Sequence, residues 1–113
     1  PKLNIEFLND LAKCLIGNKD FLSFCKFRKD LNTTKCIIYN SNWFYEQEIL
    51  VFRISANRYL HHMIRYLVGT MIAVYENKVT KSYFISLLNE PRKNVKIYKA
   101  PPQGLILEKV DYA

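Results

Sequence analysis

The segment over residues 60–75 constrains the fold most, because its apolar residues recur at the spacing of one helix face. Apolar residues stand at positions 60, 63, 64, 67, 71, 74 and 75. On a helix they form one broad stripe that packs against a core. A run of β-formers ends at Ile54, and a short polar joint at residues 55–58 separates it from the stripe. The sequence therefore predicts a strand that leads into a long, buried central helix.

Three residues beside this stripe point to a functional site. His61, Arg65 and Gly69 are spaced four residues apart, so a helix that starts at residue 60 would place them on one narrow strip. An arginine there can lie against the core while its planar guanidinium donates two hydrogen bonds to a carboxylate or phosphate. We therefore predict that Arg65 holds an anionic group in a cleft. The alternative is a surface arginine that pairs with a local acid.

The rest of the chain divides into recognisable elements. In chain order we expect a helix over residues 4–16, a short helical turn over 20–24, a hairpin of strands 35–45 and 48–55, a helix over 80–88 and a closing strand over 105–111. Asp20 and Thr80 can cap the turn and the later helix by accepting backbone N–H bonds. The sequence thus predicts a single α+β domain, an antiparallel β-sheet with helices packed on one face.

Composition restricts the partners. The chain has 113 residues, half of them apolar, which is enough for a core without disulfides. Its net charge is +7, from 17 Lys and Arg against 10 Asp and Glu, and such a surplus favours a polyanionic partner. Basic residues cluster over residues 26–29 and 92–99. From charge alone, nucleic-acid binding and an ordinary solvated lysine-rich surface are equally good interpretations.

The cysteines and histidines argue against metal and disulfide chemistry. Cys14, Cys25 and Cys36 form no CxxC pair, so we expect small buried hydrophobic side chains in a reducing compartment. His61 and His62 are adjacent and have no third ligand at a suitable spacing, so we expect no metal site. No apolar run approaches the roughly 18 residues of a membrane span, and no signal peptide is visible. We expect a cytoplasmic protein.

Three blocks of sequence resemble the tRNA pseudouridine synthase A family. Residues 57–69, Asn-Arg-Tyr-Leu-His-His-Met-Ile-Arg-Tyr-Leu-Val-Gly, are similar to its A-N-x-F-L-x-H-M-V-R-x-I-V-G signature. Residues 15–24 are similar to its L-x-G-x-H-D-F-x-x-F block, with Lys19 in place of the usual His. Residues 104–112 are similar to its closing G-L-x-L-x-x-V-x-Y block. The blocks occur in the family's order and span nearly the whole chain, but they cover only the family's C-terminal half.

The resemblance implies that the catalytic nucleophile lies elsewhere. In this family it is an aspartate of the N-terminal half, within an Arg-Thr-Asp-like motif followed by Gly-Val-His. None of the ten acidic residues here has that context, and the chain begins at Pro1 instead of Met. We therefore expect residues 1–113 to be a single C-terminal domain, half of the two-lobed synthase fold, that is inactive without the N-terminal half.

The resemblance also implies roles for individual residues. Arg65 would pair with the catalytic aspartate of the other half and orient it. We expect one of the two adjacent histidines to line the cleft and the other to pack. Asn57 would combine helix capping with substrate contact. The expected substrate-binding residues are Asn57, Arg58, His61, His62, Leu105, Lys26 and Arg28, with Leu105 at the target-base pocket and the basic residues on RNA phosphates.

The implied reaction is the isomerisation of uridine to pseudouridine in the anticodon stem-loop of tRNA, just 3′ of the anticodon. The N-glycosidic bond breaks, the base rotates, and it rejoins the ribose through carbon. The target base must leave the stack to be reached, and the resemblance implies neither metal nor cofactor. It further implies a homodimer for the full-length protein. The alternatives are a non-catalytic RNA-binding module and a structural or interaction domain.

Overall fold

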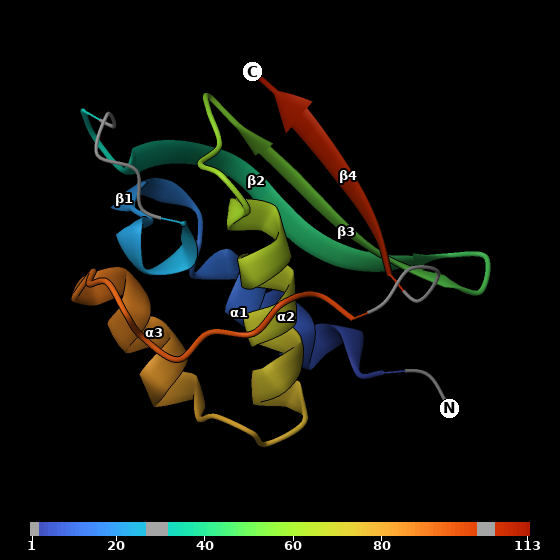
Figure 1. Cartoon of the computed structure of the whole chain (residues 1–113). Coiled ribbons are helices and arrows are strands. Elements are labelled where there is room, and N and C mark those ends of the chain that lie inside the picture. Colours follow the sequence, from blue (N-terminus) through green and yellow to red (C-terminus); the bar gives the residue numbers. More distant parts are fainter. Residues whose placement is uncertain (1–2, 27–31, 102–105) are drawn as a thin grey trace.

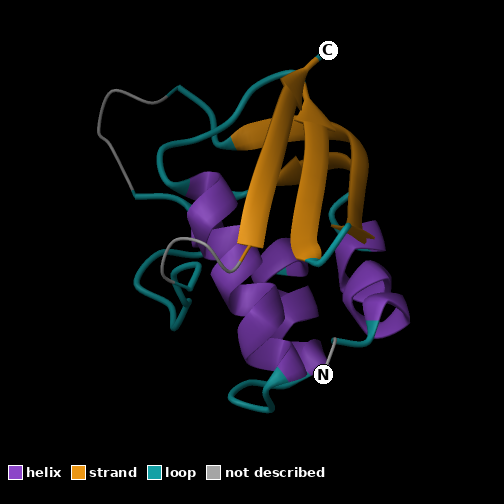
Figure 2. Ribbon diagram, turned by 90° about the vertical axis from the view of Figure 1, so that its right-hand side faces the viewer, coloured by secondary structure: helices purple, strands orange, loops and turns teal. Residues whose placement is uncertain are grey.

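The part of the chain that the structure describes folds into a four-stranded sheet with three α-helices gathered on one side of it (Figures 1 and 2). The structure is a computed structural model that describes residues 3–26, 32–101 and 106–113. The elements are α1 (Ile5–Lys13), β1 (Gly17–Asp20), the 3₁₀ helix η1 (Leu22–Phe24), β2 (Lys35–Glu46), β3 (Ile49–Ala56), α2 (Met63–Tyr75), α3 (Lys81–Asn89) and β4 (Ile106–Tyr112). The predicted α+β class is confirmed.

The strand order is β1-β2-β3-β4, and the sheet is mixed. β1 with β2 and β2 with β3 pair antiparallel, whereas β3 and β4 pair parallel. The prediction of a wholly antiparallel sheet is therefore wrong for the last strand. Between β3 and β4 the chain crosses back through two helices, and such a crossover is the connection that parallel neighbours require. β4 lies at the outer edge of the sheet (Figure 1).

The β2–β3 hairpin is confirmed and supplies the centre of the sheet. Trp43 pairs with Phe52 across the hairpin, and both side chains are buried against the helices. Their rings lie 5.0 Å apart between centroids. The turn contains Gln47 with φ of 59°. Because side chains alternate along a strand, this register also turns Leu50 and Ile54 toward the core.

Helix α1 closes one edge of β2. Asn4 begins the helix by accepting a hydrogen bond from the Phe7 N–H at 3.2 Å. Asn9 accepts from the Trp43 N–H at 2.7 Å and donates to the Trp43 carbonyl at 2.9 Å. The Asn9 amide thus takes the place of a neighbouring strand at this point of β2.

The first helix ends at Lys13, before its predicted end at residue 16. The chain instead forms the short strand β1, which opens at Gly17 with φ of 117°. Asp20 caps the following turn as predicted, since its Oδ1 accepts the Leu22 N–H at 3.0 Å. Lys19, where the family usually has His, donates to the Cys14 carbonyl at 2.6 Å. It therefore fixes the connection between α1 and β1.

The central helix α2 begins at Met63, three residues later than predicted. His62 precedes it in the left-handed region, with φ of 62°. Farther along the helix, the extended segment of residues 95–101, here called the strap, crosses α2 (Figure 1). At Gly69 a Cβ would collide with the backbone of Tyr98 and Lys99. The backbone of the strap therefore packs directly on Gly69, and a side chain there would push the strap away.

Candidate nucleic-acid interface

The loop between β3 and α2 carries four of the eight predicted site residues. Asn57 extends the strand ladder: its N–H donates to the Ile37 carbonyl at 3.1 Å, and its Oδ1 accepts the Ile37 N–H at 2.8 Å. Asn57 is therefore not a helix cap, which corrects that part of the prediction. Its side chain fixes where the loop leaves the sheet, and its contact with substrate stays a prediction.

Arg58 and Tyr59 hold the same loop from two sides. The Arg58 Nη1 donates to the carbonyls of Thr33 and Lys35 at 3.0 and 2.9 Å. The Tyr59 hydroxyl lies 3.1 Å from the Ile54 carbonyl and 2.5 Å from that of Asp111. Burial and nearby acidic groups raise the pKa of Tyr59 to about 12, so the hydroxyl stays protonated and donates. Tyr59 ties the loop to β4, and it was not among the predicted site residues.

His61 and His62 lie before the helix and not on it. Their ring centroids are 3.9 Å apart, with the ring planes tilted by 42°. Because α2 begins at Met63, after His62 in the left-handed region, His61 is outside the helix and the predicted strip of His61, Arg65 and Gly69 does not form. The His61 carbonyl accepts the Lys26 N–H at 3.3 Å. That bond brings the predicted basic residue Lys26 beside both histidines.

Basic side chains gather around the N-terminal end of α2. The pKa of His62 lies below its ordinary value, first through desolvation and then through the positive charges of His61, Arg65, Lys26 and Lys99. These five residues are called the basic cluster below. Three separate segments of the chain contribute to it. Such a concentration of positive charge attracts phosphate groups and other anions.

Arg65 lies exposed in the first turn of α2, near one acid of its own chain. That acid is Glu108 of β4, which pairs with Phe52 and so faces the helix side of the sheet. Burial raises the pKa of the Glu108 carboxyl, and the positive charge of Arg65 lowers it in part. Glu108 is therefore the residue that the local-acid interpretation of Arg65 requires. The interaction with Glu108 leaves other N–H donors of Arg65 available to a second carboxylate, because Arg65 is exposed to solvent.

Two predicted site residues, Arg28 and Leu105, lie outside the described residues. Their roles stay predictions. Lys99 belongs to the cluster although it was not among the predicted contacts. Its signal in the sequence was the basic run over residues 92–99, which does not reveal which of its lysines reaches α2.

The prediction of small buried hydrophobic cysteines is confirmed for Cys36, whereas Cys14 and Cys25 are only partly buried. All three are free, and Cys36 is only 1% exposed. Burial raises the pKa of Cys36 to about 11 and also raises the pKa of Cys25, so neither is a thiolate at neutral pH.

Within residues 3–26, 32–101 and 106–113, no three His, Cys, Asp or Glu side chains are placed to hold a metal ion. In the same ranges no helix is long and apolar enough to cross a membrane.

The basic cluster brings lysines, histidines and an arginine together from separate segments of an α+β domain. Such a surface is typical of proteins that bind nucleic acid. Residues 11–113 match the family model described as tRNA pseudouridine synthase. The chain is 38% identical over 110 residues to tRNA pseudouridine synthase A of Chlorobium limicola, covering 97% of this chain and 45% of the relative. It is 33% identical over 113 residues to the enzyme of that name from Listeria welshimeri, covering 98% and 46%.

The chain therefore belongs to the tRNA pseudouridine synthase family. It spans about half the length of the curated relatives that it matches.

Proposed function

We propose that this chain is the C-terminal half of a tRNA pseudouridine synthase that isomerises uridine in the anticodon stem-loop. The observation that carries the proposal is that Arg65 lies in the basic cluster of a chain whose residues 11–113 match the family. The basic cluster holds tRNA phosphates, and Arg65 forms part of the cleft wall. In this proposal the family's nucleophilic aspartate comes from the N-terminal half.

The position of β4 supports a missing partner half. β4 is an edge strand whose outer backbone groups have no neighbouring strand among the described residues. Leu107 and Tyr112 on this strand are 43% and 72% exposed. Proteins usually cover or blunt such edges, and here the relatives contain about as much additional chain as this one supplies. We propose that the N-terminal half covers this edge and brings the aspartate toward Arg65.

In the proposed reaction, the residues of this chain bind and orient. Arg65 donates hydrogen bonds to the aspartate of the other half and holds it ionised. Lys26, Lys99 and the two histidines hold the backbone of the tRNA while the target base leaves the stack. The bond-making and bond-breaking steps belong to the aspartate and the uridine, and no metal or cofactor enters them. The intact enzyme acts as a cytoplasmic homodimer, and the free cysteines fit a reducing compartment.

The test is pseudouridine formation on an unmodified tRNA transcript. Three proteins are compared: this chain alone, the complete product of its gene, and the complete product with Arg65→Ala. Arg53→Ala is the matched control, because Arg53 is an exposed arginine that pairs with Asp111 at 3.4 Å. We expect activity in the complete protein and in the control, and a loss of at least about a hundredfold in Arg65→Ala.

Activity of this chain alone would overturn the proposal, because one of its own acids would then be the nucleophile. An inactive complete protein that still binds tRNA would favour the second candidate function, a non-catalytic RNA-binding module, which the basic cluster also supports. tRNA binding that is absent or insensitive to salt would indicate an interaction domain, since phosphate contacts make affinity fall steeply with salt.

A further inference from the structure

The strap is held firmly across α2. The Tyr98 N–H donates to the Thr70 Oγ1 at 3.2 Å, and Thr70 is fully buried within the helix. The Tyr83 hydroxyl of α3 donates to the Lys96 carbonyl at 2.7 Å. Gly69 allows the strap backbone to approach the helix more closely than any side chain would permit. These contacts fix the position of Tyr98 through its backbone.

A hollow of about 270 Å³ lies between the strap and α2. The buried Ile72 and Ala73 give it an apolar floor, and Tyr98 forms part of its wall. The exposed residues Lys78 and Lys99 stand at its rim. Its volume is slightly below the roughly 300–1,000 Å³ of pockets for drug-sized ligands. It therefore suits a small group, and the two lysines suit a negative charge attached to that group.

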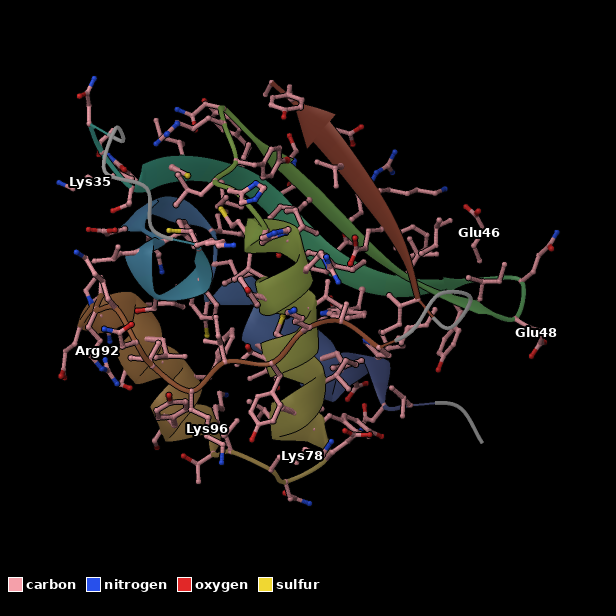
Figure 3. All side chains as sticks on the ribbon, in the orientation of Figure 1. Lys35, Glu46, Glu48, Lys78, Arg92 and Lys96 are labelled. Carbon is pink, nitrogen blue, oxygen red and sulfur yellow. The ribbon has the colours of Figure 1, made fainter. Side chains whose placement is uncertain are left out.

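Two cations flank the ring of Tyr98. The Lys78 Nζ lies 6.0 Å and the Lys96 Nζ 5.9 Å from the ring centroid, and Figure 3 shows both lysines at the lower end of the molecule. These distances are at the outer limit of cation–π attraction, at about 6 Å, so both contacts are weak. Lys78 also forms an exposed ion pair with Glu76 at 3.3 Å. Weak exposed contacts of this kind yield readily to a stronger ligand.

An aromatic face beside several lysines is the combination by which proteins hold single-stranded nucleic acid. The base stacks on the ring, and the ammonium groups take the flanking phosphates. We propose that this hollow binds an unpaired nucleotide of the tRNA, with its base on Tyr98 and its phosphates on Lys78, Lys96 and Lys99. The inference rests on the proposed function. It assigns a second RNA contact outside the cleft of Arg65.

The hollow and the basic cluster share one residue, Lys99. Lys99 lines the hollow and also contributes to the positive charge around His62. A single RNA strand that reaches both the cluster and the base site on Tyr98 would therefore pass Lys99. Glu76, which also lines the hollow, can accept a hydrogen bond from an exocyclic amino group of the base.

The test measures the affinity of the complete protein for an unmodified tRNA transcript by fluorescence anisotropy at several salt concentrations. We expect Tyr98→Ala to weaken binding about tenfold, and Tyr98→Leu to weaken it as well, because leucine keeps apolar volume without an aromatic face. Tyr98→Phe keeps the affinity. The matched control is Tyr39→Ala, which removes a tyrosine that is 45% exposed on β2. We expect Lys78→Gln to reduce the slope of log affinity against log salt by about 0.7, the value for one phosphate of a single strand.

The outcomes separate this inference from the proposed function. If the wild-type protein binds and modifies tRNA while Tyr98→Ala and Tyr98→Leu bind as tightly as wild type, the base site is overturned and the proposed function stands. If the wild-type protein binds no tRNA, both are overturned. Circular dichroism of each variant checks folding. If Tyr98→Ala is destabilised, comparing the tRNA affinities of Tyr98→Leu and Tyr98→Phe still shows whether the aromatic ring is needed for binding.

Discussion

At the scale of single residues, Arg65 has two candidate partners, and one of them, Glu108, lies among the described residues of this chain. Glu108 is half-buried on the helix side of β4, and the charge of Arg65 offsets part of the cost of burying it. The second partner is the aspartate proposed for the other half. A guanidinium has five N–H donors, so Arg65 can bind both carboxylates at once. Glu108 would then keep Arg65 oriented before the other partner arrives.

Glu108 gives a prediction for stability against pH. Its pKa is raised, so the folded state holds the proton more tightly than the unfolded state, and Glu108 reduces stability as pH rises through that range. We expect Glu108→Gln to raise the melting temperature of the chain at neutral pH. Below about pH 4 the variant and the wild type should have the same melting temperature, because Glu108 is then protonated in both the folded and the unfolded state. Thermal melts from about pH 3 to about pH 8 measure this.

The control for this variant is Glu90→Gln, which changes an exposed carboxylate after α3. A Glu108→Gln protein that is less stable than wild type at neutral pH would contradict the prediction. It would mean that the attraction to Arg65 exceeds the cost of burying the carboxylate.

At the scale of elements, the packing of the strap on α2 depends on the missing side chain of Gly69. Alanine favours a helix over glycine by about 1 kcal/mol, but overpacking a tight contact costs about 1–3 kcal/mol. Here the obstructing atoms belong to the backbone of Tyr98 and Lys99, which cannot rotate away as a side chain can. We expect Gly69→Ala to lower the free energy of unfolding by about 1 kcal/mol and to weaken tRNA binding by displacing Tyr98.

Urea denaturation measures the first effect of Gly69→Ala, and the anisotropy titration measures the second. Ser82→Ala in α3 is the control, because Ser82 is exposed on a helix and has no such neighbour. Equal or greater stability of Gly69→Ala would show that the strap can move aside without cost.

The edge of β2 gives a second prediction at this scale. Asn9 satisfies both the N–H and the carbonyl of Trp43. Removing the amide leaves two backbone groups without partners, and one unsatisfied buried group costs about 1–3 kcal/mol. We expect Asn9→Ala to lower the free energy of unfolding by at least about 2 kcal/mol. Urea denaturation beside Asn42→Ala, an exposed asparagine of β2, checks it, and equal losses in the two variants would contradict it.

At the scale of the whole molecule, the uncovered edge of β4 and the missing aspartate belong to the same proposal. If the other half covers this edge, the two halves should associate when they are made as separate polypeptides. We expect their mixture to form a complex in sedimentation experiments and to modify a tRNA transcript that neither half modifies alone. Failure of the halves to associate would contradict the proposed role of the β4 edge.

Features that depend on a few neighbouring residues were predictable from the sequence. The caps at Asp20 and Thr80 were predicted and confirmed, with the Tyr83 N–H on the Thr80 Oγ1 at 3.0 Å. The β2–β3 hairpin was also predicted, because alternation and a polar turn define it locally. The surroundings of Lys26 and Arg65 were only partly predictable, because the Lys26–His61 bond joins segments that are distant in the sequence.

The sequence by itself determined the α+β class, the caps, the hairpin and the family, because these follow from local spacing and from motifs. Tertiary structure alone decided that β4 runs parallel to β3, that residues 17–20 pair as a strand, and that α2 begins after His62. It also brought Lys99 to the basic cluster and Tyr98 to its hollow. Each of these depends on contacts between segments far apart along the chain, where local preference is weak and burial and backbone hydrogen bonding determine the conformation.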